Sequence, residues 1–244
     1  SGLNIEAVFA PEHGFKGIYE AGQELTDGIE PMTGAPIYSL YGNTKKPSQK
    51  MLNSLDVVIV DLQDIGIRYY TYISTLTLVM ESAAQNGIPI WILDRLNPMA
   101  RDINGPVLDS KFSSFVGMHP IPVQHGMTIG ELAVMINEEG WLSDGLKSNL
   151  KIIHFKGKPN VDDRIEAFNP PPSPNMLDLE TALNYLGLCL LEGTNLSEGR
   201  GTDRPFKMIG APWIENTKLL EAIAPFLHIN DQIDTISFIP RSLP

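Results

Sequence analysis

Several residues and patterns that mark common protein classes are rare in this sequence or missing from it. Its 244 residues include one cysteine, Cys189, so no internal disulfide can form, and we expect a buried structural thiol. No apolar run reaches the roughly 18–20 residues that cross a membrane. The first segment also lacks the basic start and apolar stretch of a signal peptide. Basic residues are outnumbered: 18 Lys and Arg stand against 29 Asp and Glu, a formal charge of −11, which argues against nucleic acid as a partner.

Sequence motifs for common cofactors are missing as well. No G-x-G-x-x-G follows a predicted strand, and no G-x-x-x-x-G-K-[ST] occurs. Neither H-x-x-x-H nor C-x-x-C occurs, and the five histidines are scattered. No sequence motif therefore supports a nucleotide cofactor, and a metal site is only weakly indicated, although Asp61 and Asp64 could together hold Mg²⁺.

What the chain does contain is a repeated alternation of apolar runs and helical stretches. The runs that predict buried strands are IEAVFA, DVVIVDL, IPIWILD, IPV near residue 122, and LKIIHF. Between them, a helix is expected from an N-cap at Ser74 to a stop at Gly87. Another is expected after Thr128, which stands three residues before Glu131 as in a capping box. The pattern predicts a doubly wound α/β fold with a mainly parallel sheet.

The composition changes near residue 143. Residues 168–175, FNPPPSPN, hold too much proline for the interior of a helix or strand, and predict a segment that wraps a surface or borders a cleft. An apolar helical stretch, the glycine-rich TNLSEGRGTDRPF and a further helix follow. We expect a doubly wound domain over residues 1–142 and a smaller mixed α/β subdomain over residues 143–244.

Polar clusters follow four of the apolar runs directly. They are Glu12 and His13 after AVFAP, Asp61 and Asp64 after VVIV, Asp94 and Arg95 after IWIL, and Gln124 and His125 after IPV. If the strands are parallel, every cluster lies at the carboxyl edge of the sheet, where ligands of open α/β sheets bind. The sequence therefore predicts a site at this edge.

The residue types at this edge suit glycoside hydrolysis. Carboxylates placed together can divide into one proton donor and one ionised group, which is the arrangement that breaks a glycosidic bond. Arginine forks such as those of Arg68, Arg95 and Arg200 can hold a substrate carboxylate. Structural roles stay open: Glu12 could cap a turn, Asp61 and Asp64 could bind loop amides or Arg68, and RYYTY could be core or a sugar-stacking platform.

Seven motifs together resemble the NamZ-type exo-β-N-acetylmuramidases, in order from about residue 4 to residue 214. They are APEHGFKG, TGAPIYSLYG, DLQDIGIRYYTYISTL, LDRLNP, GPVLD, PIPVQHGMTIGELA and SEGRGTDRPFKMIGAPW. The resemblance implies a Rossmann-like domain, with a second subdomain closing the active-site cleft. It also implies release of N-acetylmuramic acid from the non-reducing end of peptidoglycan fragments, in the cell envelope or outside the cell, without an organic cofactor.

The resemblance also suggests roles for individual residues. Carried over by motif, Glu12 of PEHG is the first candidate for the catalytic acid or base. Our hypothesis makes Glu12 the general acid, and Glu20, Asp61 or Asp64 supplies the second negative group. The expected substrate-binding residues are His13, Arg68, Tyr70, Arg95, His125, Glu198 and Arg200. Two departures are visible: Leu96 stands where the family commonly has proline, and the flanks look shortened, so we expect the second subdomain to be incomplete relative to the family.

Two other functions remain as alternatives at this point. One is a metal-dependent phosphoryl or acyl hydrolase that uses Asp61 and Asp64. The other is a non-catalytic protein that binds cell-wall fragments.

Overall fold

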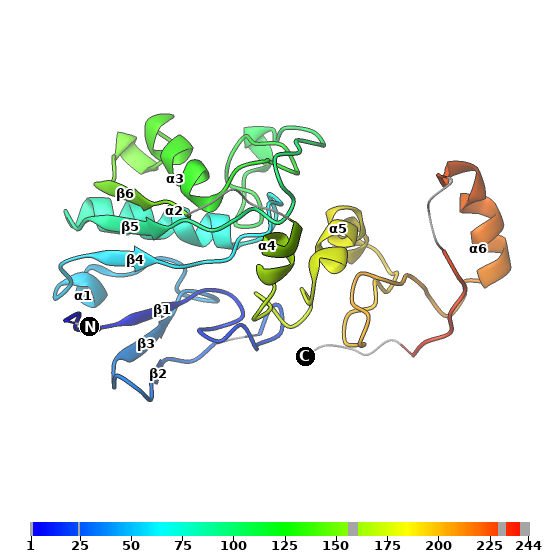
Figure 1. Ribbon diagram of the computed structural model, residues 1–244, viewed down its shortest axis with the longest axis horizontal. Helices are drawn as coiled ribbons and strands as arrows, with labels where there is room; N and C mark the ends of the chain where they lie inside the picture. The colour runs from blue at the N-terminus through cyan, green and yellow to red at the C-terminus, as the bar shows by residue number, and fades with distance from the viewer. Residues whose placement is uncertain (1, 24, 156–160, 229–232, 240–244) are drawn as a thin grey trace. The chain divides into compact units, whose positions relative to one another are not determined.

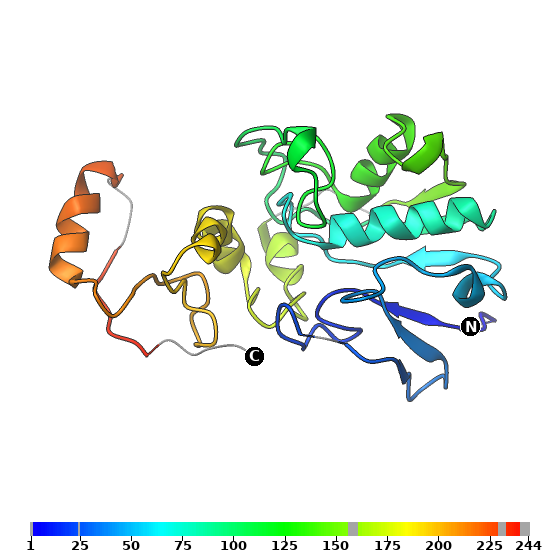
Figure 2. The ribbon, with the colours of Figure 1, turned by 180° about the vertical axis from the view of Figure 1, so that it is seen from behind.

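Figure 1 shows the computed structural model of the chain, and Figure 2 shows it from behind. The structure describes residues 2–23, 25–155, 161–228 and 233–239. The chain divides into two compact units, Ser1–Ala182 and Leu183–Pro244, called unit 1 and unit 2 below. None of the described helices is both long and apolar enough to span a bilayer.

The central sheet of unit 1 is parallel and has the order β4 (Val58–Val60), β5 (Ile90–Leu93), β6 (Leu150–Ile153). All three strands coincide with predicted apolar runs. Because β6 pairs with β5 along its whole length, the chain beyond residue 142 completes the same sheet. The expected boundary between residues 142 and 143 is therefore not the one observed: it would remove a strand from the sheet, and the division falls after Ala182.

A second sheet of unit 1 is mixed. Its order is β1 (Val8–Ala10), β3 (Pro36–Ser39), β2 (Gly28–Ile29), with β1 parallel and β2 antiparallel to β3. The sequence predicts β1 but not the hairpin of β2 and β3. In both views β1 and β4 run in the same direction (Figures 1 and 2), so their carboxyl ends lie on the same side of unit 1.

The strand predicted at IPV near residue 122 does not form. Instead, Gln124 makes isolated antiparallel bridges with Ile67 and Asn104. Proline has no N–H to give to a sheet ladder, and Pro120 and Pro122 flank Ile121 in this segment. The segment nevertheless brings Gln124 and His125 against the loop that follows β4.

Helices α2 (Tyr72–Gln85) and α3 (Ile129–Glu138) form the main helical layer. The capping box of α3 is confirmed, because Thr128 Oγ1 accepts from the Glu131 N–H and the Glu131 side chain accepts from the Thr128 N–H. Helix α2 begins earlier than predicted, after Thr71, and Ser74 is buried inside its first turn.

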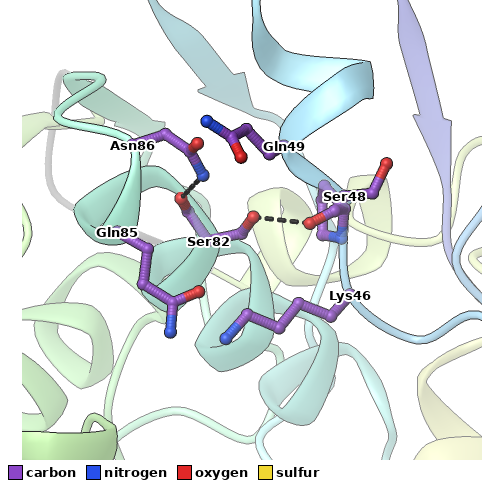
Figure 3. A pocket seen from close by; sticks show the side chains of 7 residues that line it. Lys46, Ser48, Gln49, Ser82, Gln85 and Asn86 are labelled. Atoms are coloured by element: carbon purple, nitrogen blue, oxygen red, sulfur yellow. Dashed lines mark hydrogen bonds between the residues drawn. The ribbon is translucent and has the colours of Figure 1, made fainter.

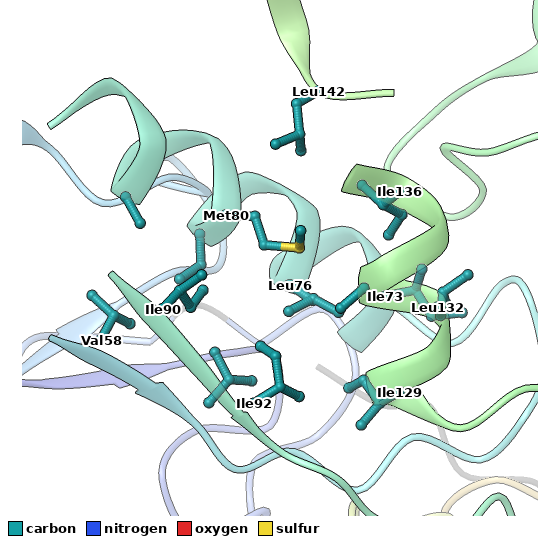
Figure 4. Packing of buried hydrophobic residues seen from close by; sticks show 14 of the residues in the cluster. Val58, Ile73, Leu76, Met80, Ile90, Ile92, Ile129, Leu132, Ile136 and Leu142 are labelled. Atoms are coloured by element: carbon teal, nitrogen blue, oxygen red, sulfur yellow. The ribbon is translucent and has the colours of Figure 1, made fainter. Parts of the chain in front are cut away.

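These helices share one apolar core with the parallel sheet. Figure 4 shows side chains of α2 and α3 meeting those of β4 and β5. The members that these four elements contribute are Val58, Val60, Ile73, Leu76, Val79, Met80, Ala83, Ile90, Ile92, Ile129, Leu132, Ala133 and Ile136. The opposite face of the sheet is partly open, since Ile59 is 44% and Ile153 39% exposed. The mixed α/β class is confirmed, with α2 and α3 packed on one face of the sheet.

Unit 2 has little regular structure. Helix α5 (Leu179–Leu188) runs across the division between the units, and η3 (Cys189–Gly193), α6 (Asn216–Ile223) and η4 (Ala224–Phe226) follow it. Its packing centres on Phe206, 1% exposed, whose ring meets that of Tyr185 edge-on at 4.7 Å. The remaining short helices, all in unit 1, are α1 (Gln49–Leu52), η1 (Ser110–Phe112), η2 (Ser143–Gly145) and α4 (Val161–Glu166).

Candidate active site

The loop between β4 and α2, residues 61–71, connects the predicted polar clusters. Its first residue, Asp61, contacts Arg95 after β5. Further along, Gly66 O accepts from the His125 N–H at 3.3 Å, and the last residue, Thr71, contacts Glu12 after β1. The predicted convergence at the carboxyl edge is therefore observed, because a single loop touches each of these clusters.

Glu12 is a buried carboxylate held by two neutral donors. It is 8% exposed, although it lies in a loop at the end of β1. Its Oε2 accepts from Thr71 Oγ1 at 2.7 Å, and its Oε1 accepts from the Gly22 N–H at 3.3 Å. Thr71 immediately precedes α2, so the carboxylate lies at the positive end of the dipole of a long, packed helix.

The loop that carries Glu12 folds back on itself. His13 has a positive φ of 72°, and its carbonyl accepts from the Tyr19 N–H while its Nδ1 lies 2.8 Å from the Tyr19 carbonyl. The same loop carries Glu20, whose Oε2 accepts from Asn175 Nδ2 at 2.8 Å. The two carboxylates predicted to work together thus share one closed loop.

The proline-rich segment lies against this loop, as the sequence predicts for a segment that wraps a surface. A Cβ added at Gly17 would meet the carbonyl oxygens of Pro171 and Pro172 at 3.2 Å. The Pro172 carbonyl also accepts from the Tyr72 hydroxyl at 2.8 Å. The segment therefore fixes both the Glu12 loop and the start of α2.

Aromatic rings line the same region. The ring of Tyr70 stacks with that of His13 at 6.5 Å and meets that of Tyr72 edge-on at 4.8 Å. Burial raises the pKa of Tyr72 well above its usual value; a hydrogen bond with Tyr70 opposes this, and the charge of Glu12 adds to it. Tyr72 therefore stays a neutral donor beside the carboxylate.

Asp64 and His125 form a deeply buried polar pair, 3% and 2% exposed. Asp64 Oδ2 accepts from the Gly66 N–H at 2.8 Å and lies 3.3 Å from His125 Nε2. His125 Nδ1 accepts from the Met127 N–H, which assigns the ring proton of a neutral imidazole to Nε2. A Cβ at Gly66, where φ is +80°, would come within 2.1 Å of Asn97 Oδ1, so the turn requires glycine.

Asp61 and Arg95 form an exposed ion pair instead. Arg95 Nε donates to Asp61 Oδ1 at 2.6 Å, and the two side chains are 45% and 50% exposed. The neighbouring Asp94 has a structural role, because its carboxylate accepts from Thr128 Oγ1 and from the Gly130 N–H at the start of α3. Arg95 is thus the member of this cluster that faces solvent.

Arg68 binds main-chain carbonyls. Its Nη1 donates to Pro106 O at 2.7 Å and to Ile121 O at 2.6 Å, and burial lowers its pKa from 12.5. This is a structural use of the guanidinium, not the pairing with Asp61 or Asp64 that the sequence left open.

Glu198 and Arg200 lie in unit 2, in the loop between Ser197 and Gly210. Arg200 Nη2 donates to Glu192 Oε1 at 2.6 Å, and Arg200 Nε lies 3.5 Å from Glu198 Oε1. The same unit holds Cys189, which is half-buried; its burial, opposed by a hydrogen bond with Tyr185, raises its pKa to about 12. The sequence predicts a buried structural thiol, and the structure has it partly buried.

The described residues do not form a metal centre. Among them, no group of three or more His, Cys, Asp or Glu side chains is placed to hold a metal ion. Asp61 and Asp64, the pair required by a Mg²⁺-dependent hydrolase, face different partners, Arg95 and His125. This geometry gives the metal-dependent alternative no pair of free carboxylates.

A separate polar hollow lies at the other end of α2. Figure 3 shows it between the end of α2 and the start of α1. Its volume is about 480 Å³. Its labelled residues are Lys46, Ser48, Gln49, Ser82, Gln85 and Asn86. Lys46 is already paired with buried Glu81 at 3.0 Å, and Ser82 Oγ donates to Pro47 O. None of the predicted site residues lines this hollow.

Sequence reasoning missed three groups that hold the carboxylates. Thr71 and the Gly22 N–H bind Glu12, and Asn175 binds Glu20. Thr71 is part of the RYYTY motif, in which the sequence analysis considered only the tyrosines. A polar residue next to the start of a helix was the signal that could have identified Thr71. For Asn175 no signal exists, because it lies 155 residues from Glu20.

Comparisons with known proteins identify the family of the chain. The family description "Exo-beta-N-acetylmuramidase NamZ, N-terminal" matches residues 1–180, and its C-terminal counterpart matches residues 183–243. The peptidoglycan beta-N-acetylmuramidase NamZ of Bacillus subtilis (strain 168) is 48% identical over 222 residues, which are 91% of this chain and 53% of that protein. The chain thus spans about half the length of this curated relative.

Solved structures are also similar to this chain. Two of these are DUF1343 family proteins from Bacteroides fragilis. The match to one of them has a TM-score of 0.80 at 36% identity, and covers 92% of this chain and 57% of that chain. The match to the other has a TM-score of 0.74 at 40% identity, and covers 86% of this chain and 55% of that chain. With both family descriptions matched, the chain belongs to the NamZ exo-β-N-acetylmuramidase family.

Proposed function

We propose that this protein is an exo-acting glycoside hydrolase that releases N-acetylmuramic acid from the non-reducing end of peptidoglycan fragments. Membership of the NamZ family supports the reaction. The observation that carries the proposal is the placement of Glu12, which is buried, held by Thr71 and Gly22, and located where β1 and the β4–α2 loop meet. A carboxyl group in such a place can serve as a general acid.

In the proposed reaction Glu12 gives its proton to the glycosidic oxygen as the bond from that oxygen to the anomeric carbon breaks. Water then adds to the anomeric carbon and returns a proton to the enzyme. Thr71 and the Gly22 N–H keep the carboxyl group in position. Glu20 shares the Glu12 loop and is the first choice for the second negative group, ahead of Asp61, which is ion-paired, and Asp64, which is buried beside His125.

The substrate's 2-acetamido oxygen can replace that second carboxylate, in a substrate-assisted reaction. A Glu20→Gln variant separates the two routes. A loss of activity of about a hundredfold or more assigns the role to Glu20, whereas activity close to wild type assigns it to the acetamido group.

Arg95 is the proposed partner of the lactyl carboxylate of N-acetylmuramic acid. Of the three candidate arginines, Arg68 donates to two carbonyls and Arg200 stands between two glutamates. Arg95 binds Asp61 through Nε and remains half-exposed, so its two Nη groups can form a fork for a carboxylate. Asp61 would then orient the fork.

The experiment that tests the proposal uses a chromogenic N-acetylmuramide with the wild type, Glu12→Gln and, as a matched control, Glu139→Gln at the exposed end of α3. We expect Glu12→Gln to lower kcat by roughly 10²–10⁴ and Glu139→Gln to leave it unchanged. Wild-type turnover by Glu12→Gln would exclude Glu12 as the acid. Binding of a muramyl disaccharide without any turnover by the wild type would make the protein a binder instead.

We further propose that the fold of unit 1 is Rossmann-like and that the protein acts in the cell envelope or outside the cell. Three of the four strand pairings are parallel, which supports the first proposal. The location of peptidoglycan supports the second. A crystal structure would test the fold, and fractionation of the source cells with an antibody would test the location.

A further inference from the structure

A further pocket is lined only by residues of unit 2. It has a volume of about 490 Å³, within the range of small-molecule sites. Glu192, Glu198 and Arg200 supply its charges, and Thr194, Asn195 and Ser197 its neutral polar groups. Leu196, Ala211 and Pro212 form an apolar part of the wall. A pocket that combines charged acceptors with an apolar wall suits a ligand with one polar and one apolar side.

The loop that forms this pocket is closed and fixed. Ser197 and Gly210 exchange two main-chain hydrogen bonds, and the Phe206 N–H donates to Glu198 O at 2.7 Å. Gly199 has a φ of +86°, and a Cβ there would meet Arg204 O at 2.7 Å, so the turn between Glu198 and Arg200 requires glycine. The pocket is therefore preformed, with Glu198 only 8% exposed.

The charges of the lining residues disfavour an anionic ligand. Two carboxylates and one guanidinium leave a formal excess of one negative charge. Arg200 Nη2 is bound to Glu192, and its Nε faces Glu198. Nη2, which a two-pronged contact with a ligand carboxylate would use, is thus already bound. Arg200 is not free to hold the lactyl group as the sequence suggested.

One buried atom indicates what the pocket lacks. Arg200 Nε is buried and makes no hydrogen bond within the described part of the chain, and Glu198 Oε1 is 3.5 Å away. A ligand hydroxyl can accept from this N–H and donate to the carboxylate at the same time. An ammonium group cannot accept, and a carboxylate cannot donate, so neither satisfies both.

We propose that this pocket binds a neutral sugar ring of the cell-wall glycan, with ring hydroxyls bound to Glu198 and Arg200 and the apolar ring face against Pro212. The proposal rests on the proposed function for the identity of the glycan. It assigns Glu198 and Arg200 to recognition of neutral hydroxyls.

The test is calorimetric binding of chitotriose, a neutral N-acetylglucosamine trimer without a lactyl group, to the full chain. We expect Glu198→Gln to weaken binding about tenfold, as for loss of a charge-assisted hydrogen bond. The matched control is Glu221→Gln, on the exposed face of α6. Asn195→Ala, at an exposed lining residue, should weaken binding about threefold and is the variant to use if Glu198→Gln does not fold.

Failure of this proposal and failure of the proposed reaction give different results. No binding of chitotriose, or wild-type binding by both pocket variants, would overturn the sugar site and leave hydrolysis of the chromogenic muramide untouched. Loss of hydrolysis in every form of the protein, with chitotriose binding still sensitive to Glu198, would overturn the reaction and leave the sugar site in place.

Discussion

Glu12 of unit 1 and Glu198 of unit 2 are equally buried, each 8% exposed, but their partners differ. Glu12 receives hydrogen bonds from a hydroxyl and a main-chain N–H, whereas Glu198 faces the guanidinium of Arg200. Glu12 is thus bound by neutral donors, and Glu198 lies beside a cation. We propose proton transfer for the first carboxyl group and acceptance of hydrogen bonds from hydroxyls for the second.

The supports of the two residues also differ. Glu12 is tied to the start of α2, which is part of the main core of unit 1. Glu198 is held by loop closure and by packing of Phe206 on Tyr185. Disturbing the core should thus affect Glu12, while disturbing the Ser197–Gly210 loop should affect Glu198.

The largest expected effect comes from changing the leaving group for Glu12→Gln. A natural disaccharide needs a protonated leaving oxygen, but a dinitrophenyl muramide does not. We expect Glu12→Gln to lose roughly 10³-fold in kcat/KM on the disaccharide and about tenfold or less on the dinitrophenyl substrate. Glu139→Gln, the matched control, should lose activity on neither substrate. Equal losses of Glu12→Gln on both substrates would remove the distinction between the two carboxylates.

The parts of this site that the sequence predicted are those with local signals. Apolar runs gave β1, β4, β5 and β6, and the capping box gave the start of α3. The clustering of polar residues at strand ends gave the site edge. These signals are short in range because they depend on side-chain periodicity and on a helix end's own unpaired N–H groups.

The features of the site that the sequence did not predict depend on contacts between segments far apart in the chain. Asp61 and Asp64, three residues apart, have opposite environments because Arg95 reaches one and His125 the other. Nothing in DLQD distinguishes them. The true partners of Glu12 and Glu20, and the absence of a strand at IPV, follow from packing and from proline chemistry that the apolar pattern concealed.

A second prediction concerns His119, a buried histidine of unit 1. His119 is 4% exposed, stacks on Trp141 at 5.0 Å, and has Nε2 2.8 Å from Thr77 Oγ1. Burial lowers its pKa from 6.5 to about 4, and the charge of Glu81 opposes this. The unfolded chain therefore takes up a proton below pH 6.5 that the folded protein does not bind until about pH 4.

The contribution of neutral, buried His119 to the free energy of unfolding is thus fully present above pH 6.5 and is lost as the pH falls toward 4. Between pH 7 and pH 5 the free energy of unfolding should fall by about 2 kcal/mol from this group. His119→Gln should lack that slope, as measured by urea unfolding at each pH. The range stops at pH 5 because Glu81, whose pKa is lowered from 4.5, loses its own contribution only below that value. An unchanged slope in the variant would mean that His119 is protonated in the folded protein.

A third prediction concerns the hydroxyl that holds Glu12. Thr71→Val keeps the shape of the side chain but removes the 2.7 Å hydrogen bond. We expect kcat to fall about tenfold with KM little changed, because the bond positions the acid and does not contact the substrate. Thr71→Ser should restore kcat and the wild-type pH profile. If serine were as poor as valine, packing of the methyl group would be the important feature.

The smallest effect separates the two aspartates of one loop by stability. Asp61→Asn removes one partner of an ion pair whose side chains are about half exposed, so the free energy of unfolding should change by less than about 1 kcal/mol. Asp64→Asn changes a carboxylate that is 3% exposed and accepts from the Gly66 N–H, and should cost about 1–3 kcal/mol. Urea unfolding of both variants at pH 7 measures the difference. Equal costs would mean that burial does not distinguish them, and that Asp61 supports the loop as Asp64 does.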